Sequence, residues 1–150
     1  MYSRVLKHIK AKDLRESVSL RFREILNPSF WIGDSLKPEV KDALMRFARA
    51  FAAYVDLDDR AITDVLLLGG NAGYNYTPFS DLDVHLVVNP MYIPNCNPEL
   101  LDQYYMDKKT LWDLTHNVTI YGVKAEPYIE RPGLVRKKSQ GVYSIMKDKW

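Results

Sequence analysis

The chain has 150 residues, of which 47% are hydrophobic and 27% are charged, and its formal net charge is +2. These values predict one globular domain with a single core, and they exclude a low-complexity chain. The single cysteine, Cys96, excludes a disulfide framework and suits the reducing cytoplasm, and one Cys with three His gives a zinc site no support. No run of about 18 apolar residues is present, so we expect no membrane-spanning segment and no membrane partner.

Charge is distributed unevenly along the chain. Residues 1–24 carry seven Lys or Arg against three acids, and residues 131–150 carry six against one, so that the acids gather between them. Basic ends of this kind are typical of solvated tails, and they also fit a nucleic-acid partner.

Residues 1–60 are predicted to form N-terminal helices. A capping box at Asp13 indicates a first helix, which the residue before Pro28 should end. Pro38 suits a first helical turn, and the apolar residues that follow recur at helical spacing to about Tyr54.

The predicted catalytic core spans residues 61–130, and a basic C-terminal segment of residues 131–150 follows it. Apolar runs and turn residues predict strands at 62–68, 81–88, 118–121, 124–130 and 141–146, a loop at 71–80 and a helix at 98–115. The helix at 98–115 should bury Leu101, Tyr104, Tyr105, Leu111 and Trp112. This pattern indicates an α/β (α+β) domain.

The most informative stretch joins a glycine pair to two acids. Gly69 and Gly70 end an apolar strand, where backbone N–H groups can approach a phosphate closely. Asp81 and Asp83 lie two residues apart on the following strand, so their carboxylates share one face and can reach one hard cation. A phosphate cradle with paired carboxylates is what metal-assisted phosphoryl transfer requires.

At these residues the chain resembles the DNA polymerase β-type nucleotidyltransferase superfamily, whose pattern is a hydrophobic residue, Gly, Gly or Ser, about ten residues, then two acids around a hydrophobic residue. Residues 68–70 and 80–84 fit this pattern. The run 73–86, together with Glu126 and the later segment 141–144, further resembles small nucleotidyltransferase-like proteins of tailed bacteriophages.

The resemblance implies a nucleotidyltransferase fold, a short mixed β-sheet with helices packed against it. It implies transfer of a nucleoside monophosphate from an NTP to a hydroxyl of an unidentified RNA, protein or small molecule, with ATP as the favoured NTP. Mg²⁺ or Mn²⁺ would bind Asp81, Asp83 and Glu126, which are also the expected catalytic residues. The expected nucleotide-binding residues are Gly69, Gly70, Asn71, Ser80 and Lys124.

Strand alternation leaves two candidates for a third carboxylate that would join Asp81 and Asp83. Glu126 and Glu130 share a face with Lys124 but lie about 13 Å apart, so at most one joins the aspartates. The resemblance selects Glu126 as general base or metal ligand. Pro127 beside it cannot donate to a sheet ladder, which predicts an edge or an irregularity there.

Two departures from the family pattern bear on function. Gly70 stands where a serine is commoner, and we expect Gly70→Ser to be tolerated. Residues 71–80 contain no Lys or Arg, so the triphosphate must be neutralised by metal and by distant bases such as Lys124, Lys137 or Lys138. A second hypothesis is therefore a binding protein with this fold and little or no turnover, such as an antitoxin-like partner of a toxin.

Three other residues are weaker candidates. His85 continues the face of the two aspartates, although a single histidine on a strand is commonly a packing residue. Tyr74 and Tyr76 lie in the predicted loop, where they would either stack on a base or pack against the protein.

Overall fold

A computed structural model describes residues 23–93 and 97–150 of the chain. Most of the helix predicted from Asp13 lies outside the described residues, and residues 23–27, its predicted end, are not helical. No helix within the described ranges is long and apolar enough to cross a membrane.

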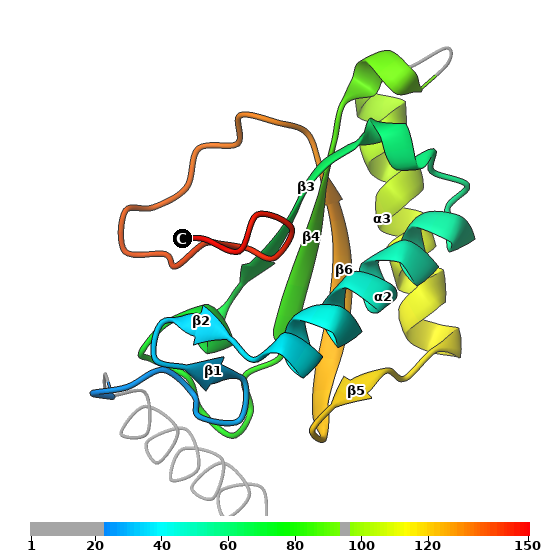
Figure 1. The fold of residues 1–150 in the computed structure, drawn as a ribbon. Helices are drawn as coiled ribbons and strands as arrows, with labels where there is room; N and C mark the ends of the chain where they lie inside the picture. Colours follow the sequence, from blue (N-terminus) through cyan, green and yellow to red (C-terminus); the bar gives the residue numbers. More distant parts are fainter. Residues whose placement is uncertain (1–22, 94–96) are drawn as a thin grey trace, which may run out of the picture.

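The described chain forms two helices, a small hairpin and a five-stranded sheet, together with three single turns of 3-10 helix (Figure 1). The helices and strands are β1 (Trp31–Ile32), β2 (Ser35–Leu36), α2 (Pro38–Tyr54), β3 (Ile62–Leu68), β4 (Leu82–Val88), α3 (Pro98–Thr115), β5 (Thr119–Ile120), β6 (Val123–Glu130) and β7 (Tyr143–Ser144). The 3-10 turns span Asp59–Ala61, Gly70–Ala72 and Pro90–Tyr92. The β1–β2 hairpin was not predicted, because two-residue strands carry no periodicity.

The large sheet is mixed, as predicted. Its strand order is β5-β6-β4-β3-β7, and β4 and β6 run parallel while the other neighbours run antiparallel. Along β4, Leu82, Val84 and Leu86 are fully buried in the core. Successive side chains of a strand point to opposite faces, so Asp83 and His85 lie on the other face, here called the open face.

Helix α2 crosses the core face of the sheet (Figure 1). It begins at Pro38 and ends at Tyr54, as predicted, and its buried residues recur every three or four positions. Phe47 and Phe51 meet Trp112 of α3 edge to face, with ring centroids 6.0 and 5.5 Å apart. These aromatic contacts fix α2 against α3.

Helix α3 lies beside β6, and Asn97 caps it by accepting a hydrogen bond from the Glu99 N–H. Its bounds agree with the prediction, but its buried face is narrower. Tyr105 and Trp112 are buried, whereas Tyr104 and Leu111 are 43% and 48% exposed. The prediction for Tyr104 and Leu111 was wrong because α3 meets the core along one stripe at the sheet edge.

Pro127 lies at an open stretch of β6, as its missing N–H predicts. Strand β5 flanks β6 only at Val123 and Lys124, and the Ala125 N–H still donates to Val118. The nitrogen of Pro127 is on the same side two residues later, where no described strand pairs with β6.

The chain after β6 closes the far edge of the sheet. Residues 131–142, here called the strap, contain no helix or strand and lead to β7, which pairs with β3 (Figure 1). The Ile145 N–H donates to the Val65 carbonyl, and Trp150 stacks on Trp31 at 5.0 Å. Residues 143–145 are therefore packed into the core, and the half-exposed Trp150 lies against the N-terminal hairpin.

Gly141 sets how closely the strap approaches the sheet. A Cβ at this position would lie 1.8 Å from the carbonyl oxygen of Ala72, a residue that is itself fully buried. Only a residue without a side chain allows this backbone contact.

We therefore predict that Gly141→Ala lowers the free energy of unfolding by about 2–3 kcal/mol, because either the strap or the Gly70–Ala72 turn must move. Gly73→Ala is the matched control, since its Cβ would meet only the flexible Asn75 side chain at 3.1 Å. Urea denaturation followed by tryptophan fluorescence measures both variants. Equal losses in the two variants would contradict the close packing of Gly141.

Candidate functional site

The sheet register brings Asp83 and Glu126 together. Asp83 pairs with Leu68 on one side and with Glu126 on the other, and Asp81 lies just before β4. Glu130 pairs with Val87, farther along the strands. The structure thus places Glu126, and not Glu130, beside the aspartates.

The three carboxylates interact electrostatically. Burial, then repulsion from Glu126 and Asp81, raises the pKa of Asp83 to about 6. Burial and Glu126 also raise the pKa of Asp81. Burial and mutual repulsion thus both disfavour the charged forms of the two aspartates, and a bound cation would relieve the repulsion.

Glu126 differs from the two aspartates because cations and a hydroxyl surround it. Its carboxylate accepts a 2.9 Å hydrogen bond from the Tyr128 hydroxyl and lies 3.4 Å from Lys124 Nζ and 3.9 Å from Lys109 Nζ. Burial alone would raise the pKa of Glu126, but these three groups together outweigh it and lower the pKa. In this state Glu126 is a weak base.

Lys109 is a site residue that the sequence did not reveal. It lies on α3 and reaches round the edge of β6, where it also pairs with Asp113 at 2.6 Å and sits 4.4 Å from the Tyr128 ring centroid. In the sequence it is one of a Lys–Asp pair four residues apart, which is typical of an exposed helix face.

The turn after β3 lies directly against the Asp83 carboxylate. Gly69 has a φ of 83°, and a Cβ there would lie 2.6 Å from Asp83 Oδ2. Both the positive φ and the close approach require glycine. The backbone of this turn and the carboxylate of Asp83 therefore meet without an intervening side chain.

Gly70 is constrained by Ser80. A Cβ at Gly70 would lie 2.5 Å from Ser80 Oγ, which accepts a 2.9 Å hydrogen bond from the Thr77 N–H. The tolerance expected for Gly70→Ser is therefore corrected: Ser80 already occupies the space that a serine at Gly70 would need.

Asn71 holds the loop of residues 71–80 together from inside. It is 1% exposed, and its Nδ2 donates to the carbonyls of Ser80 and Asp81 at 2.8 and 3.1 Å. Its Oδ1 accepts from Asn27 Nδ2 at 2.9 Å. These contacts use the Asn71 side chain, so it positions Asp81 and is not available as the nucleotide ligand that we expected.

A second polar cluster lies farther along the open face. His85 Nδ1 is 2.8 Å from Glu130, and Arg136 of the strap donates to the same Glu130 oxygen. Tyr128 stacks on His85 with ring centroids 4.6 Å apart. Burial, with Arg136 and Lys109, lowers the pKa of His85 against the opposing effect of Glu130, so His85 is neutral at pH 7 and donates its Nδ1–H. This cluster anchors the strap over the open face.

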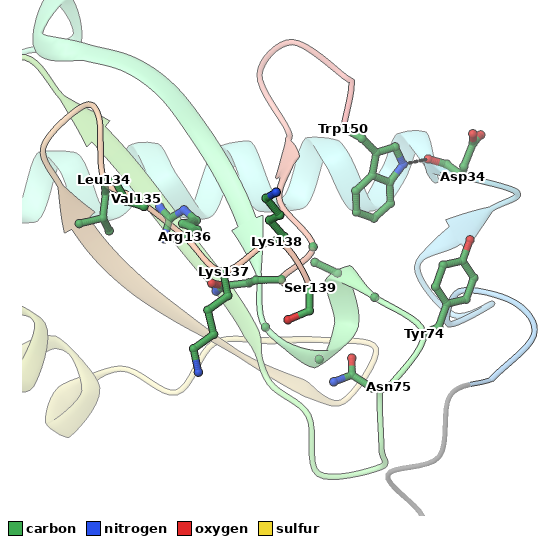
Figure 2. A pocket seen from close by; sticks show the side chains of 16 residues that line it. Asp34, Tyr74, Asn75, Leu134, Val135, Arg136, Lys137, Lys138, Ser139 and Trp150 are labelled. Atoms are coloured by element: carbon green, nitrogen blue, oxygen red, sulfur yellow. Dashed lines mark hydrogen bonds between the residues drawn. The ribbon is translucent and has the colours of Figure 1, made fainter.

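A cavity of about 1040 Å³ lies between the glycine turn and the strap (Figure 2). Gly69 and Gly70 form one wall, and Lys137 and Lys138 lie on the opposite wall. Asp81, Asp83 and Glu126 do not line this cavity. The glycine turn therefore borders both the acidic cluster, at Asp83, and the basic cavity.

Of the two loop tyrosines, only Tyr74 lines the cavity (Figure 2). Tyr76 instead faces Arg23, whose guanidinium carbon lies 4.7 Å from the ring centroid. Packing against the protein therefore accounts for Tyr76.

The acidic side chains at the site supply only part of the ligand set that a hard cation needs. In the ranges 23–93 and 97–150, no three His, Cys, Asp or Glu side chains are arranged to hold a metal ion by themselves. Mg²⁺, however, is commonly bound through one or two carboxylates with substrate phosphates and water completing its shell. Asp81 and Asp83 match that requirement in chemistry and in charge.

Comparison with protein-family models, with curated proteins and with solved structures finds no significant match to this chain. The site's chemistry is therefore the basis for a functional proposal.

The contact between Gly70 and Ser80 gives a first prediction for the site. Gly70→Ser should lower the free energy of unfolding by about 1–2 kcal/mol, because Ser80 must rotate and lose its bond to Thr77. In the background of Ser80→Gly, the same substitution should cost less, since the obstructing side chain is gone. A double-mutant cycle from urea denaturation measures the coupling. Strictly additive effects would show that the two positions do not compete for space.

The raised pKa of Asp83 gives a second prediction. A folded-state pKa of about 6, above the ordinary value of 3.8, means that the folded protein binds this proton more tightly than the unfolded chain. The resulting stability is present below about pH 4 and is lost as pH rises through 6. Without metal, Asp83→Asn should therefore stabilise the fold by about 1–2 kcal/mol at pH 8, after allowance for solvent screening, and not at pH 4.

Denaturation of both proteins at the two pH values in EDTA measures this difference. Asp42→Asn, in an exposed pair with Arg46 on α2, is the control and should show little pH dependence. A gain from Asp83→Asn that is the same at pH 4 and pH 8 would place its cause outside the ionisation of Asp83.

Proposed function

We propose that this protein is a metal-dependent nucleotidyltransferase that moves a nucleoside monophosphate from an NTP to a hydroxyl acceptor. ATP is the favoured NTP. The observation that carries the proposal is the close packing of the glycine turn on Asp83, so close that a Cβ on Gly69 would lie 2.6 Å from Asp83 Oδ2. It sets a backbone that could bind phosphate against a carboxylate whose pKa is raised by burial and by the neighbouring acids. The acceptor class and the cytoplasmic location belong to the same proposal.

Asp81 and Asp83 would hold Mg²⁺ or Mn²⁺ on the triphosphate. The metal's contribution would be to neutralise charge that develops at the α-phosphate. Gly69 would present backbone to the phosphates, and Asn71 would keep Asp81 in place through its bond to the Asp81 carbonyl. In the transfer, the acceptor oxygen forms a bond to the α-phosphorus as the bond to pyrophosphate breaks.

Glu126 is the group proposed to take the proton from the acceptor hydroxyl. In the structure its carboxylate is shared with Lys124, which lies 3.4 Å away and is partly exposed. A bound polyphosphate offers Lys124 an alternative anionic partner. Loss of that pairing would raise the pKa of Glu126 and make it a better base.

One observation favours the second candidate, a binding protein with little or no turnover, such as an antitoxin-like partner of a toxin. Two lysines and Tyr128 already satisfy Glu126, which is the group that catalysis would need free. This candidate predicts a stable protein complex without release of pyrophosphate.

The test of the metal site compares two pairs of substitutions. Asp81→Asn with Asp83→Asn should abolish the Mg²⁺-dependent part of ATP-analogue binding in calorimetry, because both carboxylates are lost. Asp42→Asn with Asp107→Asn removes two exposed acids from α2 and α3 and should leave binding within about twofold of the parent. Unchanged Mg²⁺-dependent affinity in the first pair would remove the metal assignment.

Turnover separates the two candidate functions. With labelled NTPs, Mg²⁺ and cell extract as the source of acceptor, the parent should release pyrophosphate, and Glu126→Gln should slow the release roughly 100-fold. Glu130→Gln should keep the chemical step, since Glu130 contacts His85 and Arg136 instead. A parent that binds nucleotide but releases no pyrophosphate would favour the binding-protein candidate.

A further inference from the structure

The strap resolves a shortage of positive charge at the proposed site. The loop of residues 71–80 carries no Lys or Arg, so nothing in it neutralises a triphosphate. Across the cavity from that loop, the strap contributes Arg136, Lys137 and Lys138 to the wall (Figure 2). Among residues 23–93 and 97–150, Asp34 is the one acidic residue that lines the cavity, and Figure 2 shows its carboxylate directed away from the lysines.

These three bases are not equivalent. Arg136 forms an ion pair with Glu130, and the Arg136 side chain is 16% exposed. Lys137 and Lys138 are exposed, and their Nζ atoms have no ion pair or hydrogen bond with any residue in 23–93 or 97–150. Lys124, the third candidate named from the sequence, is paired with Glu126. The two strap lysines are thus the cations at the cavity that a ligand can use without breaking a described ion pair.

The strap is also held in position. Arg136 attaches it to Glu130 on the open face, and Gly141 packs directly on the carbonyl of Ala72 beside the glycine turn. The two lysines lie between these attachment points and leave the strap in opposite directions (Figure 2). A fixed backbone lowers the entropy cost of presenting these side chains, which, because they diverge, would contact separate phosphates of an extended ligand.

We propose that this cavity binds a polyphosphate, namely the triphosphate of the NTP, and that Lys137 and Lys138 supply the cationic contacts that residues 71–80 lack. This inference rests on the proposed function for its choice of ligand. It assigns the strap to substrate binding and leaves the metal and the proton transfer to the acidic cluster that adjoins the cavity at the glycine turn.

Binding of inorganic tripolyphosphate without Mg²⁺ tests the strap independently of the metal site. Calorimetry at low salt, with tryptophan fluorescence, to which Trp150 at the cavity wall contributes, as a second signal, should give saturable binding by the parent. Lys137→Gln with Lys138→Gln should weaken this binding at least roughly tenfold, because two charge-assisted contacts are lost. Each single substitution should account for part of the loss.

Arg49→Gln with Lys149→Gln is the matched control. It removes two exposed positive charges that have no described ion pair and do not line the cavity, so binding should change less than twofold. An equal loss in the control would reduce the effect to general charge attraction and overturn the proposal. So would unchanged binding in the lysine variant, or a parent that binds a single-stranded oligonucleotide through these lysines but not tripolyphosphate.

The aspartate pair distinguishes this proposal from the function on which it rests. Asp81→Asn with Asp83→Asn should keep the metal-free tripolyphosphate binding while losing the Mg²⁺-dependent gain for ATP. If the lysine variant retains parental affinity for tripolyphosphate and for Mg²⁺–ATP while the aspartate variant loses the latter, the metal site stands and the strap assignment fails. If tripolyphosphate binds through the lysines but Mg²⁺–ATP gains nothing from the aspartates, the strap assignment stands and nucleotidyl transfer fails.

Discussion

The register between β3 and β4 determines the whole site. Because Leu68 lies opposite Asp83, the chain must turn at Gly69 directly beside the Asp83 carboxylate. A shift by one residue would turn Asp83 into the core and place Val84 on the open face. The buried leucines and valines of β3 and β4 oppose such a shift, so hydrophobic packing on one face secures the position of charges on the other.

Charge at the site is balanced by groups that come from separate elements. Asp81 and Asp83 belong to the start of β4, Glu126 and Lys124 to β6, and Lys109 to α3. Burial raises the pKa of all three acids, but the Tyr128 hydroxyl and the two lysines outweigh it at Glu126, whose pKa falls while those of the two aspartates rise. The pKa shifts thus separate the two aspartates, whose charged forms are disfavoured, from Glu126, whose charged form is favoured. That asymmetry is consistent with different roles for chemically similar groups.

Local patterns predicted the elements better than the contacts between them. The helices α2 and α3 and the strands β3 and β4 follow from apolar spacing and from Pro or Asn at the helix starts. The same spacing could not choose between two adjacent stripes of α3, and only packing beside β6 shows that Tyr104 is outside the core. Side-chain partners could not be predicted from the sequence where they come from distant elements, as for Lys109. The glycine pair was found from sequence, but the reason for Gly70 lies in Ser80, ten residues away in the chain.

The pairing of β3 with strands on both sides has a consequence for the order of folding. Its partner β4 follows after a short loop, whereas Ser144 of β7 bonds to Asp64 across 80 residues of sequence, and Trp150 bonds to Asp34 across 116. Closing such long loops is slow because their entropy is lost before the contacts form. The sheet centre and α2 should therefore assemble first, with the strap docking afterwards. By the same reasoning, docking of residues 141–150, which buries Tyr143 and Ile145, should be the step that closes the cavity.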